Sequence, residues 1–277
     1  MRGPKVLLEG PTGTGKTTAL GTAADWYAKR GWPVYALFTE NSTEVFRGYW
    51  TDRGKKKPDN VHITDMIVRP TTLSSLIDAA DKVGKLTYES LTKLVDANRS
   101  GDNNAYWKIL KTCADFTDSD TGERFGGLET FPTESLFIMD SLSETSNAAL
   151  KMQVGSRPTA SQSDYLVAQN NLLNFLRLLT QGTRCAVVVT AHVDRLVDEL
   201  NGGTRITTKS VGKALASDIP QLFSDVIMTT RMGTEWTWDT ANAQADLKTR
   251  NLPVNSKLKP DFTPLLDKWF SRAQGDK

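Results

Sequence analysis

Residues 10–17, GPTGTGKT, constrain this chain more than any other stretch. They read glycine, four residues, glycine, lysine and a hydroxyl residue, between an apolar run, KVLLE, and a helical stripe that starts at Thr17. Gly10, Gly13 and Gly15 allow the backbone to turn its N–H groups inward around phosphate oxygens. The N-terminal end of the following helix attracts the same anion. The pattern predicts a nucleoside triphosphate site on a strand–loop–helix unit.

The residues of this loop have separate expected roles. The predicted nucleotide-binding set is Gly10, Pro11, Thr12, Gly13, Thr14, Gly15, Lys16, Thr17 and Thr18. Lys16 is expected to reach the β- and γ-phosphates, and the Thr17 hydroxyl to bind Mg²⁺. A second metal-binding residue is expected at the end of a buried strand, where Asp140 of LFIMDS fits. Because Ser141 rather than glutamate follows Asp140, the residue that activates water must come from elsewhere. The expected cofactors are ATP and Mg²⁺.

Continuous apolar strands separated by helices indicate a parallel sheet that is covered on both faces. Predicted strands of this kind are KVLLE, PVYALFTE, residues 62–68, ESLFIMDS and RCAVVVTAH. In the last third, SDVIMTTRM, TEWTWDT and QADLKTR read as successive strands joined by short turns. The predicted fold is α/β, a mainly parallel twisted sheet flanked by helices with an antiparallel extension near the C-terminus. We expect a single domain over residues 1–277, with a helical excursion at residues 71–130.

Composition excludes several classes of protein. With 39% hydrophobic and 24% charged residues the chain is ordinary for a globular protein, and a net charge of +2 means that any nucleic-acid site must be local. The apolar runs are too short to span a membrane, and the start lacks the apolar core of a signal peptide. Cys113 and Cys185 lack metal-ligand spacing and read as buried residues of a reduced compartment. We therefore expect a cytoplasmic protein, in the host cytoplasm if it is phage-encoded.

The order of the motifs resembles the RecA-like ATPase core. It comprises the phosphate loop, a strand ending at Glu40, the IMDS strand, the VVVTAH strand and a late KTR segment. Within that group the chain looks most like the short phage RecA-like proteins of single-strand annealing and recombination, in which TAH, GKALASDIP and KTRN occur in similar positions. The resemblance covers most of the chain and matches residues 51–130 only loosely. It implies a Mg²⁺-dependent ATPase that binds single-stranded DNA and forms a homo-oligomer with ATP at subunit interfaces. A single-strand-binding protein is a further expected partner.

The resemblance also implies roles for residues outside the loop. Glu40 would orient the attacking water, with a helix-start acid as the alternative reading. His192, at the end of the apolar strand AVVVTAH, would sense the γ-phosphate. The alternative is a histidine that caps the strand end. Lys248 and Arg250, which would point the same way from a strand, would reach the γ-phosphate held by a neighbouring subunit. A charged pair on an edge strand is the alternative for these two cations.

Loops after the IMDS and TAH strands, residues 151–164 and 195–213, are where RecA-like proteins meet single-stranded DNA. The second loop has a local excess of two positive charges. Its candidate DNA contacts are Arg195, Arg205, Lys209 and Lys213. It has no aromatic residue for base stacking, and a solvated loop is the alternative. The cationic run Arg53–Lys57 reads as a solvated turn, and Trp236 and Trp238 read as core or subunit packing.

Other functions of the same loop remain open at this point. A hexameric helicase-like DNA motor shares the fold, and strand displacement of a forked duplex would favour it. A small-molecule kinase would need an acceptor pocket and an arginine-bearing lid, which the helical segment 71–117 could supply. A nucleotide-gated scaffold would bind ATP and hardly hydrolyse it, so that Glu40→Gln would leave its activity unchanged.

Overall fold

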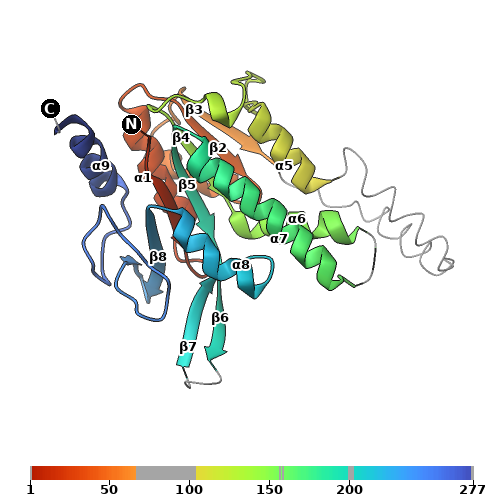
Figure 1. Cartoon of the computed structure of the whole chain (residues 1–277). Helices are drawn as coiled ribbons and strands as arrows, with labels where there is room; N and C mark the ends of the chain where they lie inside the picture. The colour runs from red at the N-terminus through yellow and green to blue at the C-terminus, as the bar shows by residue number, and fades with distance from the viewer. Residues whose placement is uncertain (1, 67–103, 156, 158, 199–202, 276–277) are drawn as a thin grey trace.

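The computed structural model describes residues 2–66, 104–155, 157, 159–198 and 203–275. Within these residues seven strands form one sheet in the order β3-β2-β4-β5-β1-β8-β9 (Figure 1). The strands are β1 Lys5–Glu9, β2 Val34–Phe38, β3 Val61–Asp65, β4 Leu136–Asp140, β5 Ala186–Ala191, β8 Asp225–Met232 and β9 Glu235–Asp239. Every pairing is parallel except that of β8 with β9. The predicted fold class, a mainly parallel sheet with an antiparallel extension toward the C-terminus, is confirmed.

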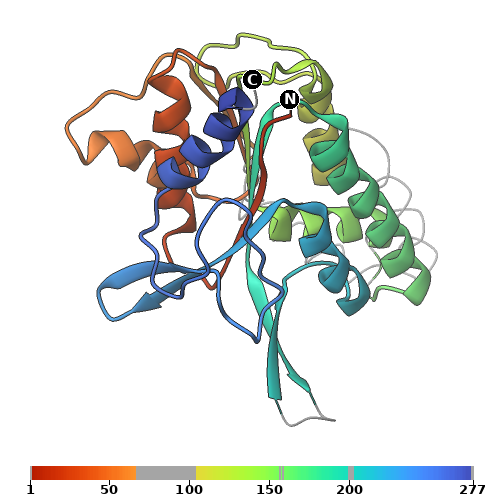
Figure 2. The same cartoon turned by 60° about the vertical axis from the view of Figure 1, so that its left-hand side comes forward.

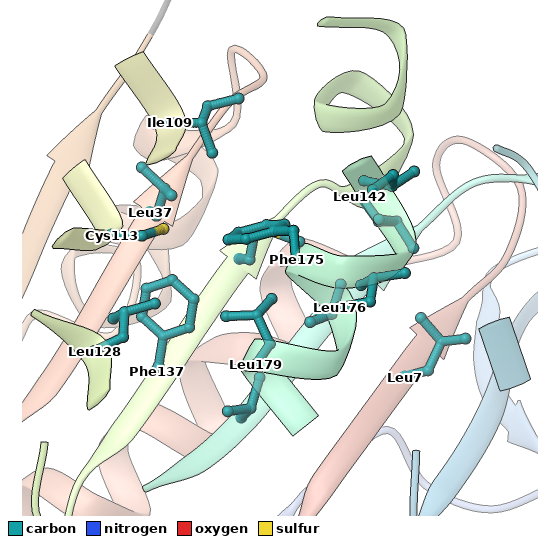
Figure 3. Close-up of a cluster of buried hydrophobic side chains, with 14 of the residues drawn as sticks. Leu7, Leu37, Ile109, Cys113, Leu128, Phe137, Leu142, Phe175, Leu176 and Leu179 are labelled. Carbon is teal, nitrogen blue, oxygen red and sulfur yellow. The ribbon is translucent and has the colours of Figure 1, made fainter. Parts of the chain in front are cut away.

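Helices cover both faces of the sheet. They are α1 Lys16–Ala28, α2 Thr43–Thr51, α5 Ala105–Ala114, α6 Leu142–Val154, α7 Gln162–Arg177, α8 Lys213–Asp218 and α9 Thr263–Gly275, with short turns η1 Leu128–Thr130, η2 Leu178–Gly182 and η3 Ile219–Leu222. Strand periodicity divides the core, because successive side chains point to opposite faces. Leu7 packs in the cluster under α5, α6 and α7 (Figure 3), whereas Val6 and Leu8 pack with α1, α2 and α9.

Side-chain caps fix where several helices begin. Asn104 accepts a hydrogen bond from the Trp107 N–H at the start of α5, and Ser141 accepts one from Glu144 N–H at the start of α6. Ser161 begins α7 with a reciprocal capping box that involves Asp164. The cap of α6 follows the end of β4 directly, which places Ser141 at the edge of the sheet.

A separate two-stranded ribbon replaces the loop expected at residues 195–213. β6 (Val193–Asp198) and β7 (Gly203–Thr208) pair antiparallel and project beyond the sheet in both views (Figures 1 and 2). The expectation of a loop was therefore wrong for the residues of these two strands. VDRLVD and GTRITT are rich in β-branched residues, and pairing satisfies their backbone groups.

The strand expected at QADLKTR does not form. Lys248 makes one antiparallel bridge with Val226, and the chain then turns. A turn at Asn242, whose side chain accepts a hydrogen bond from the Gln244 N–H, begins the segment. The buried Asp225 carboxylate ends it by accepting hydrogen bonds from the backbone N–H groups of Arg250 and Asn251. A carboxylate that gathers successive N–H groups stabilises a turn in place of a ladder.

Most of the predicted helical excursion, residues 71–130, lies outside the described residues, which resume at residue 104. Its described part contains α5 and η1. The third strand ends at Asp65, before the predicted end at residue 68. Among the described helices, none combines the length and apolarity that crossing a bilayer requires.

Candidate functional site

The carboxyl ends of the parallel strands meet at one edge of the sheet, where such folds bind ligands. The phosphate loop follows β1 there, Glu40 follows β2, and His192 follows β5. Asp140 is the last residue of β4. These segments surround a cavity of about 690 Å³ that Lys16, Glu40, Asp140 and His192 line together. Residues 100 or more positions apart in the chain are thus brought to one site.

The loop has the conformation that a phosphate site needs. Gly13 and Gly15 have φ of 77° and 83°, a region that residues with a Cβ rarely adopt. Gly15 is the residue before the first turn of α1, whose N-terminal end faces the loop. Lys16 Nζ donates to the carbonyl oxygens of Gly10 and Pro11 at 2.8 Å each, so it lies folded against the loop. Burial lowers the Lys16 pKa, and a bound phosphate would offset that effect.

Asp140 is the hub of a hydroxyl network. Thr17 Oγ1 and Ser42 Oγ each donate to its Oδ2 at 2.8 Å. The hydroxyl of Thr190 donates to its Oδ1. The described residues contain no group of three or more carboxylate, histidine or cysteine side chains that could hold a metal. One carboxylate and one hydroxyl suit Mg²⁺, which fills the rest of its octahedron with phosphate oxygens and water, so the donor set fits this ion.

Glu40 is held from two sides. The Ser141 hydroxyl donates to Oε1, and His192 Nε2 lies 3.4 Å from Oε2. The hydrogen bond with His192 lowers the pKa of Glu40, and the bond from Ser141 acts in the same direction against burial. Glu40 is therefore ionised at neutral pH, with its carboxylate oriented. The His192 backbone N–H donates to Ser143 Oγ at 2.9 Å, which fixes the strand end that presents the ring.

The far end of the cavity lies along α1 and α2. Val45, Tyr49, Arg53, Lys259 and Pro260 line it. The Arg53 guanidinium carbon is 4.1 Å from the centroid of the Tyr49 ring, a cation–π contact. The solvated-turn reading of Arg53–Lys57 is thus incomplete, because Arg53, although exposed, forms part of the cavity wall.

Lys248 and Arg250 lie away from the cavity of their own chain. Lys248 bridges to Val226, and its Nζ donates to the Gln221 carbonyl oxygen at 3.2 Å, toward the amino-terminal end of β8. Arg250 is exposed beside Asp225, the first residue of β8. The phosphate loop lies at the opposite edge of the sheet, so neither cation is placed to reach the phosphates within one subunit.

The candidate DNA contacts are spread over the β6–β7 ribbon. Arg195 pairs in register with Ile206, and Arg205 with Leu196. Since residues in register share a face and neighbours alternate, Arg195 and Arg205 point to opposite faces. Arg205 Nη2 also lies 2.7 Å from Asp246 Oδ2. Lys209 and Lys213 are exposed at the root of the ribbon and the start of α8.

The sequence reading missed several residues of this site. Ser42 and Tyr49 carry no motif, because a hydroxyl before a helix and a tyrosine on an apolar stripe are common everywhere. The expectation for the tryptophans holds for Trp238, which is fully buried against Phe262, and is incomplete for Trp236. Trp236 is 45% exposed and lines the cavity beside the phosphate loop.

Comparison with known proteins gives distant structural similarities. No protein-family model matches the sequence, and no curated relative matches it. One similar solved structure is a prototypical ATPase from the type III secretion system of pathogenic bacteria, with 15% identity and a TM-score of 0.38 over 83% of this chain and 53% of that chain. Another is the flagellar accessory protein FlaH from Methanocaldococcus jannaschii, with 11% identity and a TM-score of 0.38 over 86% and 76% of the two chains. The chain spans about half the length of the secretion ATPase that it matches, 53%.

Proposed function

We propose that this chain is a RecA-like, Mg²⁺-dependent ATPase. The observation that carries the proposal is the single cavity in which the phosphate loop, the Thr17–Asp140 pair and the Glu40–His192 pair meet. A scaffold would need the same loop but not an ionised carboxylate at its mouth, whereas a kinase would need an acceptor pocket beside that carboxylate. An oriented carboxylate next to the γ-phosphate position favours water as the acceptor.

Different residues of the site have different roles in phosphoryl transfer to water. Backbone N–H groups of the loop and Lys16 bind the phosphates and stabilise the charge that develops on them. Thr17 and Asp140 would hold Mg²⁺, which neutralises phosphate charge when bound. Glu40 accepts a hydrogen bond from the attacking water and aims its oxygen at phosphorus. Since the pKa of Glu40 is lowered, its main contribution is orientation and electrostatics rather than strong proton affinity.

The extended end of the cavity supports a nucleoside rather than a bare polyphosphate. From Thr18 the wall continues along α1 past Ala19 and Thr22 to the ring of Tyr49. At this end the Arg53 guanidinium lies over the Tyr49 ring, and Pro260 is a further lining residue, so a planar cation and an apolar ring are available to contact a purine base. We assign the phosphates to the loop and the base to the Tyr49 end.

Phosphate release tests the enzymatic proposal. Glu40→Gln keeps the size of the side chain and removes its charge, so the rate of phosphate release from Mg·ATP is expected to fall at least about 100-fold. The affinity for Mg·ADP is expected to stay within about threefold, because Glu40 does not bind the diphosphate. Glu44→Gln, an exposed carboxylate on α2, is the matched control. A Glu40→Gln protein with the wild-type rate would remove Glu40 from the mechanism.

Single-stranded DNA is the effector that we propose, in recombination or annealing of the phage type. Support comes from the ribbon β6–β7, which projects from the sheet directly after His192 and carries exposed cations. The Lys209 backbone N–H donates to the His192 carbonyl oxygen at 2.8 Å, so the root of the ribbon contacts the catalytic edge. This arrangement would let DNA on the ribbon change the position of His192.

Oligonucleotide binding tests the DNA proposal. A labelled single strand is expected to bind at low salt with ATP and to lose affinity as salt rises, since phosphate contacts release counterions. The double variant Arg195→Ala, Lys209→Ala is expected to lose about two phosphate contacts. The slope of log affinity against log salt concentration should then become shallower by the contribution of about two cations. Lys55→Ala combined with Lys56→Ala, at exposed positions beyond α2, is the control. If both double variants bound the oligonucleotide equally well, the DNA site would not lie on the β6–β7 ribbon.

We also propose that the chain works as a homo-oligomer in which Lys248 and Arg250 act on ATP held by the next subunit. Support comes from their exposure and from their distance from the phosphate loop of their own chain. A single-strand-binding protein is the further partner that the resemblance implies.

A further inference from the structure

Trp236 contacts the phosphate loop at two points. Its Nε1 donates to the Gly13 carbonyl oxygen at 3.2 Å. A Cβ added to Gly15 would lie 3.2 Å from the Trp236 Cδ1 atom, so the indole packs directly over the Gly15 backbone. The residue comes from β9, more than 200 positions after the loop. The Trp236 side chain is 45% exposed, yet it makes both contacts. It is therefore neither a core residue nor a freely solvated surface residue.

The hydrogen bond to Gly13 fixes the orientation of a peptide plane. In a trans peptide the C=O and the following N–H point in opposite directions. With the Gly13 oxygen directed at the indole, the Thr14 N–H points away from it. Because Gly13 and Gly15 sit in the left-handed region, this part of the loop lacks the backbone restriction that a side chain would impose. A contact from outside the loop therefore restricts the orientation of this plane.

The neighbouring strand β8 contacts the same segment of the loop. Thr14 Oγ1 lies 2.6 Å from Thr229 Oγ1 on β8, and it donates to the Pro11 carbonyl oxygen at 2.7 Å. Thr229 in turn donates to the carbonyl oxygen of Glu9, the last residue of β1. The β8–β9 hairpin thus contacts the centre of the loop through Thr229 and Trp236.

The indole is itself positioned by the hairpin. The Arg231 guanidinium carbon is 4.9 Å from the Trp236 ring centroid, and its Nε donates to the Gly233 carbonyl oxygen at 2.9 Å. Arg231 and Trp236 are also paired in register across β8 and β9. The ring therefore has a defined place without being buried.

We propose that Trp236 is a positioning residue for the phosphate loop: its indole N–H holds the Gly13–Thr14 peptide so that the Thr14 N–H is presented to phosphate. This inference rests on the proposed nucleotide site and adds to it a residue that acts through the loop. The contact acts on bound diphosphate and triphosphate alike, because it concerns the loop and not the transferred group. Removal of the N–H donor should therefore weaken binding without slowing the chemical step.

Trp236→Phe tests the inference, since it keeps an aromatic ring at this position and removes the N–H donor, and the same change at an unrelated tryptophan controls for the smaller ring. The expected result is about a three- to tenfold higher Kd for both Mg·ADP and Mg·pyrophosphate in calorimetry, the range for one neutral hydrogen bond. The KM for ATP is expected to rise by the same factor, with kcat within about twofold. The ADP-dependent change in tryptophan emission is expected to be lost in this variant.

Trp107→Phe is the matched control, because Trp107 has the same 45% exposure on α5 and does not line the cavity. It is expected to keep the wild-type Kd values and the emission change. Wild-type Kd values in Trp236→Phe would overturn the inference and leave the nucleotide site standing. A lower Tm in Trp236→Phe with unchanged Kd values would assign Trp236 a purely structural role, which also overturns it. Failure of the wild-type protein to bind either ligand would contradict the nucleotide site itself.

Discussion

Glu9 is a buried carboxyl one residue before the phosphate loop. It is 1% exposed, and its Oε2 accepts a hydrogen bond from Thr208 Oγ1 at 2.7 Å. Burial raises the pKa of Glu9 to about 7. Thr208 is the last residue of β7, so this pair joins the end of β1 to the root of the projecting ribbon. No sequence motif marks Glu9, because an acid at the end of an apolar strand becomes informative only when its surroundings are known.

The raised pKa predicts a pH-dependent stability. The folded protein binds the Glu9 proton more tightly than the unfolded chain does, so the free energy of unfolding should fall as pH rises from about 4.5 to about 7. Glu9→Gln removes this loss. The wild-type protein should therefore lose up to about 3 kcal/mol relative to Glu9→Gln between pH 5 and pH 8, measured by urea unfolding. Glu235→Gln, at an exposed position, is the control. A constant difference across this range would contradict the burial of a titrating Glu9.

The packing of α1 on α2 depends on one glycine. A Cβ at Gly21 of α1 would lie 2.2 Å from Cγ of Tyr49 on α2, so the ring lies directly on the helix backbone. Glycine inside a helix costs stability relative to alanine, and here it allows the ring to reach the cavity wall. The stripe that predicts α1 includes Leu20, Ala23 and Ala24 and says nothing about this contact.

Gly21→Ala is expected to displace Tyr49. It should raise the Kd for Mg·ADP about threefold or more and leave that for Mg·pyrophosphate unchanged, because the proposal assigns the base, and not the phosphates, to the Tyr49 end. It should also lower Tm, against the usual gain of about 0.5–1 kcal/mol for such a change in a helix. Gly48→Ala on α2 is the matched control, since its Cβ would meet nothing closer than 3.4 Å. Parallel loss of ADP and pyrophosphate affinity would contradict the placement of the base.

At the level of the whole molecule, the sequence predicts what backbone periodicity and a local motif determine. The parallel strands are confirmed because their apolar runs must be covered on both faces, as the split between Leu7 and Val6 shows. The strand at QADLKTR was wrong in part because the Asp225 carboxylate, more than 20 residues earlier, binds the backbone at the end of this segment. The sequence does not predict the contact of Trp236 with the phosphate loop, because its partner Gly13 is remote in sequence. Contacts between distant segments decide these cases.

The proposed homo-oligomer yields a prediction for mixed subunits. In this proposal Arg250→Ala subunits would bind ATP but lack the cation for a neighbour, and Lys16→Ala subunits would lack a competent loop but supply Arg250. Mixing two inactive preparations should therefore restore a fraction of phosphate release, because some interfaces combine an intact loop with an intact arginine. Mixing Lys16→Ala with Glu40→Gln subunits is the control, because both substitutions damage the ATP site of their own subunit and the mixture contains no intact site. If the Arg250→Ala protein alone were fully active, Arg250 would be a surface residue without a role in hydrolysis.

Titration of Mg·ATP, in a non-hydrolysable form, onto the wild-type and Lys16→Ala proteins addresses the nucleotide cavity itself. The wild-type protein should bind one equivalent per chain with a Kd below about 1 mM, the usual range for such sites. Lys16→Ala should bind about 10- to 100-fold more weakly, since a charge-assisted contact with phosphate is lost. Lys29→Ala, an exposed lysine on the same helix region, should match the wild-type protein. Equal affinity in Lys16→Ala, or no binding by the wild-type protein, would contradict a phosphate site at residues 10–17.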